Sequence, residues 1–129
     1  MPSFNPGRSM LLALALALPA APASASGDAA AGKQIFNAQC AMCHAVLPGS
    51  SGIGPSLAGV YGQPAASQPD YDYSPALKNA HLTWTAASLD KFLASPQAAV
   101  PGTKMPFAGL PDATQRADVI AFLAALDGK

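Results

Sequence analysis

Two cysteines and one histidine stand together in this chain and are its residues best suited to chemistry. Cys40 and Cys43 are three residues apart, and His44 follows the second cysteine directly. Residues three and four apart share one face of a helical turn, so both thiols could add to the two vinyl groups along one haem edge. A neutral imidazole is a good iron ligand. The spacing is the attachment signature of a c-type haem.

The same five residues are also compatible with a disulfide, a redox-active thiol pair or half of a zinc site. Zinc would need two further ligands, but the chain has no other cysteine and its only other histidine, His81, stands alone. A thioredoxin-like pair would lie in a βαβ pattern, which this chain lacks. Haem attachment is therefore the favoured interpretation.

The first 25 residues differ in composition from the rest of the chain. Arg8 is followed by an apolar run from Met10 to Leu18 and by the small-residue sequence Ala23–Ala25. This order is typical of a secretory signal peptide, and the apolar run is too short to span a bilayer as a helix. We expect residues 1–25 to be removed and residues 26–129 to form one domain in the periplasm. Free thiols would be oxidised there, so covalent use of both cysteines is expected.

Charge and size limit the function classes. The chain has seven basic and seven acidic residues, and loss of Arg8 with the leader leaves six basic residues. A nucleic-acid-binding surface would need clustered lysines and arginines, so no nucleic-acid partner is expected. A domain of this length buries a modest core and gains from a large apolar prosthetic group.

Three helical segments are predicted, and no strand pattern is present. The first covers about 29–39 with Asp28 as its cap, and it ends at the cysteine motif. The second begins after Thr85 and must end before Pro96. The last opens at Asp112, with Gln115 in a capping-box position. Its buried stripe is expected at i, i+3, i+4 and i+7 spacing, which selects Val119, Phe122, Leu123 and Leu126.

Glycine and proline place long loops between these helices. Residues 48–62 are expected to be loop, and 63–82 mostly loop with at most one helical turn. Residues 98–111 contain two prolines and two glycines before Pro111, and they are not expected to form regular structure. The predicted fold is thus all-α, with three main helices and long loops that need something to pack against.

Met105 is the candidate for the second axial position of the iron. Of the four methionines, Met1 and Met10 belong to the leader, and Met42 lies between the cysteines and faces away from the ring they would hold. Met105 lies in a loop that two prolines stiffen. The alternatives are that Met105 is ordinary core filler or that His81 is the ligand instead.

From Gly27 onward the chain resembles the class I c-type cytochromes, the family of mitochondrial cytochrome c and its bacterial relatives. The resemblance rests on six stretches in the family order and nearly the family spacing: GDAAAGKQIF, CAMCH, GPSLAGVYG, DYSPALKNAHLTW, PGTKMPFAG and RADVIAFL. It implies the small cytochrome c fold wrapped around one covalently bound haem c.

The resemblance also implies roles for individual residues. Gly32 and Phe36 match residues of the first helix that pack against the last helix, where Phe122 is the matching aromatic. The Pro55 carbonyl would accept a hydrogen bond from the ligand histidine and so fix its tautomer. Three positions match residues that hydrogen-bond the haem propionates: Tyr73, Trp84 and Thr103. Phe107 matches the aromatic residue beside the exposed haem edge.

The departures from the family pattern concern polar residues. An arginine near the propionates is replaced by Gln63, a tyrosine near the methionine sulfur by Phe92 and an asparagine by Leu77. The lysines that ring the haem edge in mitochondrial members correspond here to Gln39, Gln97, Pro111 and Asp112. These replacements argue against docking through a lysine ring.

Together these features predict a periplasmic monohaem electron carrier with His44 and Met105 as axial ligands, not an enzyme. The expected partners are redox proteins, with a dehydrogenase or cytochrome complex as donor and an oxidase as acceptor. The carrier is expected to be a monomer without stable membrane insertion. The alternatives are the electron-accepting haem subunit of a periplasmic dehydrogenase and, less favoured, a haem protein that binds peroxide or a gas.

Overall fold

The computed structural model describes residues 2–3, 15–18 and 27–126. Most of the predicted signal peptide and its cleavage site lie outside these residues. The helices are α1 (Ala29–Gln39), α2 (Pro75–Asn79), α3 (Ala86–Ala94), α4 (Pro96–Ala99) and α5 (Ala113–Ala125). Within the described residues the only β pairing is an isolated bridge between Pro64 and Thr83. The predicted all-α fold is confirmed.

α1 begins where its sequence predicts. The Asp28 carboxylate accepts hydrogen bonds from the backbone N–H groups of Ala30 and Ala31, which have no partner inside the helix. The backbone N–H of Asp28 donates to Asp118 Oδ1 at 2.7 Å. Because Asp118 belongs to α5, the start of α1 is tied to the last helix.

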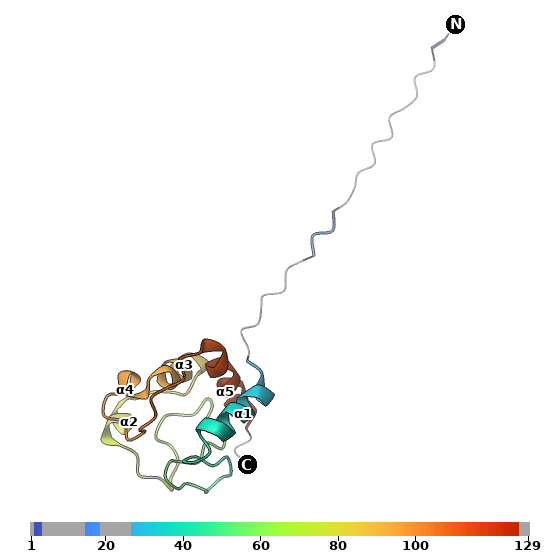
Figure 1. Ribbon diagram of the computed structural model, residues 1–129. Coiled ribbons are helices and arrows are strands. Elements are labelled where there is room, and N and C mark those ends of the chain that lie inside the picture. The colour runs from blue at the N-terminus through green and yellow to red at the C-terminus, as the bar shows by residue number, and fades with distance from the viewer. Residues whose placement is uncertain (1, 4–14, 19–26, 127–129) are drawn as a thin grey trace.

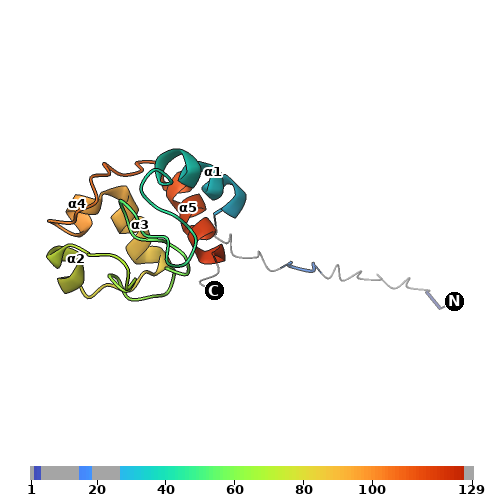
Figure 2. The same cartoon turned by 90° about the horizontal axis from the view of Figure 1, so that it is seen from below.

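α1 and α5 pack closely at one end of the domain, and Figures 1 and 2 show them side by side. The rings of Phe36 and Phe122 lie 5.3 Å apart between centroids. Gly32 lies against the α5 backbone, because a Cβ added there would be 1.9 Å from the carbonyl oxygen of Asp118. The contact that the resemblance implied is present, and it fixes the helix that leads into the cysteine motif.

α3 ends as predicted, but the residues after it differ from the expectation. Thr85 and Ser88 form a reciprocal capping box at its start. Pro96 stops α3 but begins α4, with Ser95 as N-cap, since proline lacks the N–H that a helix interior needs and the first turn does not. The expectation of irregular structure from residue 98 onward was therefore wrong for Ala98 and Ala99.

α5 supplies the centre of the core. The Asp112 carboxylate accepts from the backbone N–H of Gln115 at 3.0 Å, one of the two hydrogen bonds of a capping box. Val119 and Leu123 are buried as predicted, and Phe122 and Leu126 are partly buried. Ile120 is also buried, which the four-residue stripe did not include.

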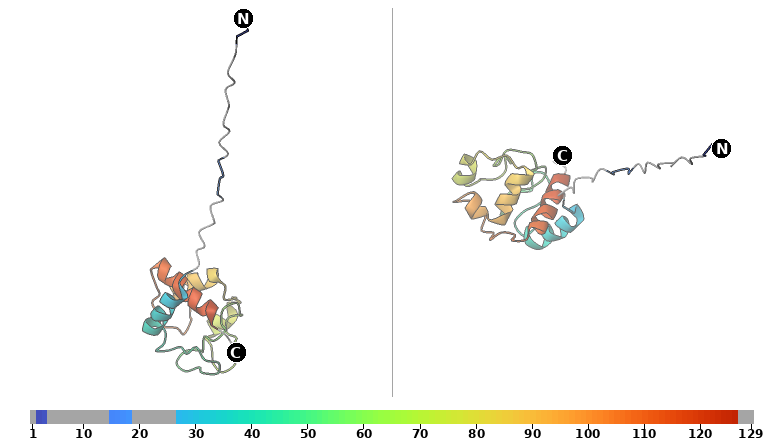
Figure 3. Two further views of the ribbon diagram at one scale, coloured as in Figure 1. Left: turned by 90° about the vertical axis from the view of Figure 1, so that its right-hand side faces the viewer. Right: turned by 90° about the horizontal axis from the view of Figure 1, so that it is seen from above.

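Long loops complete the domain. Residues 48–62 contain no helix, and 63–82 contain only the five-residue α2. Figure 3 shows these loops running along one side of the domain, opposite the packed helices. Among the described residues, no helix is long and apolar enough to cross a membrane.

Candidate functional site

A cavity of about 570 Å³ lies between the helices and the long loops. Its volume falls within the range of small-molecule and cofactor pockets, and its lining is mostly apolar. All of the site residues predicted from the sequence line it: Cys40, Cys43, His44, Pro55, Tyr73, Trp84, Thr103, Met105 and Phe107. Segments from both halves of the chain thus meet around one space.

The cysteine motif forms a turn directly after α1. The backbone N–H groups of Cys43 and His44 both donate to the Cys40 carbonyl, at 3.1 and 3.0 Å. Cys40 is buried, Cys43 is partly buried and both thiols are free. The Met42 side chain points away into solvent and is 87% exposed, as its place between the cysteines predicted. The turn therefore brings Cys40, Cys43 and His44 close together, and all three line the cavity.

Burial controls the protonation of the Cys40 thiol. Loss of solvation, with a smaller contribution from the nearby Cys43, raises the pKa of Cys40 to about 11. The thiol of the haem-free folded chain is therefore protonated at neutral pH. A buried neutral thiol behaves as a small apolar group, which suits the apolar lining.

His44 is oriented by the loop that follows the motif. Its Nδ1 lies 2.7 Å from the Pro55 carbonyl oxygen, the contact that the resemblance implied. A carbonyl can only accept, so Nδ1 carries the proton and Nε2 keeps a free lone pair. Burial lowers the pKa of His44, although the hydrogen bond to Pro55 acts in the opposite direction. The imidazole is thus held in the neutral form that binds metal.

Gly54 allows the histidine to approach the loop this closely. A Cβ at Gly54 would lie 2.7 Å from His44 Cε1 and 2.9 Å from Nδ1. Its backbone N–H donates to the Cys43 carbonyl at 2.8 Å. A side chain at this position would push the ring away from Pro55, so the glycine is required by packing.

Met105, Thr103 and Phe107 come from the loop between α4 and α5. Two glycines in this loop have left-handed backbone conformations, Gly102 with φ of 90° and Gly109 with φ of 115°. The Gln97 side chain donates to the carbonyl oxygens of Thr103 and Met105, at 2.9 and 3.3 Å. Met105 is partly buried against the core and is one of the residues that line the cavity from this loop.

Aromatic and aliphatic side chains line the cavity between these residues. Trp84 and Phe92 pack edge to face with centroids 5.0 Å apart, and Leu77 is buried beside the same cavity. Phe92 and Leu77 are positions where the family pattern has polar residues. Their burial makes this part of the cavity wall apolar.

Two polar residues discussed in the sequence analysis differ in burial: Tyr73 is buried, whereas Gln63 is exposed. The Tyr73 hydroxyl accepts from the backbone N–H of Gln68 at 3.2 Å, and burial raises the pKa of Tyr73. Gln63 is exposed, and its carbonyl accepts from the backbone N–H of Trp84 at 2.9 Å.

The structure separates the rival ligands and adds a residue. His81 is exposed and is not one of the cavity-lining residues, so the cavity favours Met105. Tyr71 lines the cavity although the sequence analysis did not select it. Its ring packs edge to face on Tyr73 with centroids 5.0 Å apart. The spacing of Tyr71 and Tyr73 could have indicated it, since residues two apart in an extended segment lie on the same side.

Comparisons with known proteins agree with this geometry. The family model described as "Cytochrome c" matches residues 29–127. The chain belongs to the cytochrome c family. Cytochrome c2 of Rhodomicrobium vannielii is 51% identical over 110 residues, which cover 84% of this chain and 87% of that protein. Cytochrome c of Euglena viridis is 45% identical over 100 residues, which cover 78% of this chain and 98% of that protein.

A solved structure extends the match to three dimensions. Cytochrome cH from Methylobacterium extorquens superposes with a TM-score of 0.72 at 44% identity, covering 76% of this chain and 98% of that chain. The fold is therefore the cytochrome c fold that the sequence predicted. Family membership also implies electron transfer rather than enzymatic catalysis.

The residues present fit a haem. Cys40, Cys43 and a neutral His44 line the cavity from one turn, Met105 lines it from a separate loop, and most of the remaining lining is apolar. Within the described residues no group of three or more histidine, cysteine or acidic side chains could hold a metal ion, which disfavours the zinc alternative. As a cytochrome c with one such motif, the chain carries one haem c through Cys40 and Cys43.

Proposed function

We propose that this cytochrome c is a periplasmic one-electron carrier with His44 and Met105 as the axial ligands of its iron. One observation carries the proposal: His44 and Met105 line the same cavity, and His44 has its Nδ1 engaged by Pro55 at 2.7 Å. Both side chains are thus available to a haem held at Cys40 and Cys43. The predicted leader supports the periplasmic location.

The chain orients the ligand side chains and keeps water out of the pocket, while the haem supplies an iron that gains and releases one electron. The Pro55 carbonyl keeps the proton of His44 on Nδ1 and leaves Nε2 for the iron. A thioether ligand and an apolar pocket both favour the ferrous form, which raises the reduction potential. Leu77 and Phe92 reinforce this effect, because they exclude water from the pocket.

The decisive test replaces Met105 with alanine in the haem-loaded protein, because attachment and axial ligation use different residues. Met105→Ala should keep its covalent haem but lose the sulfur-to-iron charge-transfer absorbance. It should also bind added imidazole faster and show a lower reduction potential. Spectra, stopped-flow binding and redox titration measure these changes.

Met42→Ala is the matched control, since it removes the other methionine of the domain and its side chain is 87% exposed. It should leave all of these properties unchanged. If Met105→Ala retains the charge-transfer band and binds imidazole no faster than the native protein, then another residue is the ligand.

The two rival functions predict different observations. A subunit of a periplasmic dehydrogenase should elute from size-exclusion chromatography of native extract with its complex rather than as a monomer. A protein that binds peroxide or a gas should show a high-spin ferric spectrum. A low-spin spectrum together with monomeric elution would support the free carrier.

A further inference from the structure

The loop that carries Met105 has backbone hydrogen bonds only at its two ends. In the stretch 103–110, the first N–H donates to the Val100 carbonyl at 3.0 Å and the last N–H donates to the Leu93 carbonyl at 2.8 Å. In the described part of the chain, none of the backbone N–H groups of residues 104–109 donates to another backbone carbonyl. The middle of the loop therefore depends on side chains for its position.

Gln97 supplies such a contact from the side of α4. Its Nε2 donates to the Thr103 carbonyl oxygen at 2.9 Å and to the Met105 carbonyl oxygen at 3.3 Å. A carbonyl can only accept, so the amide nitrogen faces the loop, and its two hydrogens can serve one carbonyl each. One planar group thus bonds the backbone on both sides of residue 104, including the residue that carries the candidate sulfur ligand.

The short helix that carries Gln97 is firmly attached to the core. Pro96 is fully buried and Val100 is buried. The Ser95 hydroxyl oxygen accepts from the Ala98 N–H at 3.4 Å, and the Val100 N–H donates to the Pro96 carbonyl at 2.8 Å. Gln97 itself is exposed, so its hydrogen bonds, rather than burial, hold its side chain against the loop.

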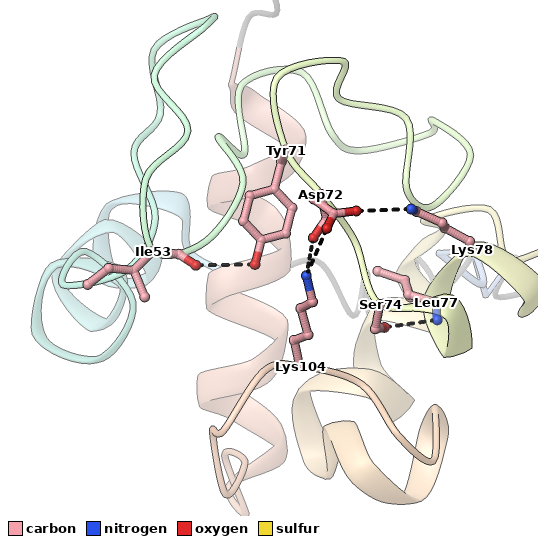
Figure 4. Close-up of polar contacts among 7 residues, drawn as sticks. All are labelled: Ile53, Tyr71, Asp72, Ser74, Leu77, Lys78 and Lys104. Carbon is pink, nitrogen blue, oxygen red and sulfur yellow. Dashed lines mark hydrogen bonds and ion pairs between the residues drawn. The ribbon is translucent and has the colours of Figure 1, made fainter.

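Lys104, which lies between the two carbonyls, has a different partner. Its ammonium group donates to the Asp72 carbonyl oxygen, and Figure 4 shows its side chain extending from the loop toward Asp72. The Asp72 carboxylate lies 3.6 Å from this ammonium group and 3.1 Å from that of Lys78. The Lys104 contacts therefore use its side chain, whereas Gln97 holds the backbone on either side of it.

Gln97 also stands at a position where mitochondrial relatives have a lysine of the haem-edge ring. A lysine keeps its charged head in water, whereas an uncharged amide can lie against the loop and donate to its carbonyls. The loss of a docking charge at this position thus coincides with contacts to the Met105 loop. This gives the departure from the family pattern a structural consequence in this chain.

We propose that Gln97 is a positioning residue for Met105, holding the loop to α4 through the carbonyl oxygens of Thr103 and Met105. This inference rests on the proposed ligation of iron by Met105. While both hydrogen bonds are in place, the backbone of Met105 cannot move away from α4. Without them, the loop is restrained only at its ends and by Lys104, so the sulfur leaves the iron more often.

The test measures how fast added imidazole replaces the sixth ligand in the ferric, haem-loaded protein at fixed pH and ionic strength, since this rate reports opening of the Met105 loop. Gln97→Ala removes both donors and should raise the rate roughly three- to tenfold, the scale of one to two net hydrogen bonds. Gln97→Glu keeps the shape but places an acceptor against two acceptors, so its rate should rise at least as much. Both variants should retain the sulfur-to-iron absorbance, because the closed loop remains the major state.

Gln34 provides the matched controls, because it is an exposed glutamine on α1 and is not one of the cavity-lining residues. Gln34→Ala and Gln34→Glu make the same chemical changes away from the Met105 loop. Their imidazole-binding rates should stay within about twofold of the native rate, the scale of a surface substitution.

A double variant shows whether Gln97 acts through Met105. Met105→Ala removes the sulfur, so imidazole binding no longer waits for the loop to open. Adding Gln97→Ala to this variant should change the rate by less than about twofold, although the same substitution accelerates binding in the native protein. A general structural role for Gln97 would instead act equally in both backgrounds.

Several outcomes would overturn the proposal. It fails if both Gln97 variants bind imidazole at the native rate, or if the Gln34 variants accelerate binding equally. It also fails if Gln97→Ala accelerates binding by the same factor with and without Met105. A native protein without the sulfur-to-iron absorbance would overturn both the ligand assignment and this inference, whereas an intact absorbance with unchanged rates would overturn only the inference.

Discussion

At the scale of single residues, Asp72 has an unusual electrostatic environment for a side chain that is 85% exposed. The pKa of its carboxyl lies below the ordinary value, chiefly because Lys78 donates a hydrogen bond to it and then because of the charge of Lys104. The folded-state pKa is thus lower than that of the unfolded chain. The ion pairs therefore stabilise the folded protein fully at pH values above the unfolded-state pKa of about 3.9. This stabilisation is lost as the pH falls through the lower pKa of the folded state.

An NMR titration of the Asp72 carboxyl should therefore give a midpoint below that of a free aspartate. Lys78→Gln should raise the midpoint, since it removes the first cause of the shift. Lys33→Gln on α1 removes a lysine that does not pair with Asp72 and should leave the midpoint unchanged. A native midpoint at the free aspartate value would mean that the two ion pairs do not persist in solution.

At the scale of the elements, the contact between α1 and α5 sets the direction from which the cysteine motif enters the cavity. Gly32→Ala should weaken it, because the new methyl group would meet the Asp118 backbone at 1.9 Å and neither helix can yield locally. The expected loss in free energy of unfolding is about 1–3 kcal/mol, the usual cost of overpacking. Denaturant titration followed by circular dichroism measures it.

Gly52→Ala provides the matched control for this substitution. Nothing lies within 4 Å of a Cβ at Gly52, so the same chemical change should alter stability by no more than about 1 kcal/mol. Equal losses in the two variants would show that the close approach of α1 and α5 is not what Gly32 provides.

At the scale of the whole molecule, charge is scarce where a partner would dock. The positions that match the lysine ring, Gln39, Gln97, Pro111 and Asp112, are all exposed and none is basic. Lys78 and Lys104 are both paired with Asp72. Meanwhile Phe107 lines the cavity and is only partly buried. Docking on a small, largely apolar surface around Phe107 is therefore our hypothesis for the redox partners.

The second-order rate of electron transfer to the native partner should then change little with ionic strength. Electrostatic steering decays over about 8 Å at physiological salt, so a charge-steered carrier slows steeply as salt rises. Gln39→Lys adds a charge at the cavity rim and should make the profile slope, which shows that the assay detects steering. A tenfold or steeper fall in the native protein would mean that charge pairing guides docking.

Export is a second property of the whole molecule. If residues 1–25 are a cleaved signal peptide, the mature protein isolated from the periplasm should begin at Ser26. N-terminal sequencing or intact-mass measurement of the haem-loaded protein tests this. A mature chain that retains Met10 to Leu18 would indicate an uncleaved anchor instead.

The sequence by itself determined the features that depend on neighbouring residues. Asp28, Thr85 and Asp112 marked three helix starts, because a capping side chain reaches only two or three residues along the chain. Cys40, Cys43 and His44 indicated haem attachment, since their spacing alone lets them meet one ring edge and its iron. Prolines and glycines marked most of the loops, because each acts on the backbone at or next to its own position.

Only the tertiary structure decided how distant segments meet. The cavity joins residues from Phe36 to Leu123, and no local pattern reports which loop faces which. The role of Tyr71 and the contact between Lys104 and Asp72 were not predicted. In both cases the interacting residues lie far apart in the sequence, and only the fold brings them together. α4 was missed for a related reason. Pro96 was read only as the end of α3, but a proline is equally suited to the first turn of a new helix. That Ser95 caps such a helix is seen only in the folded chain.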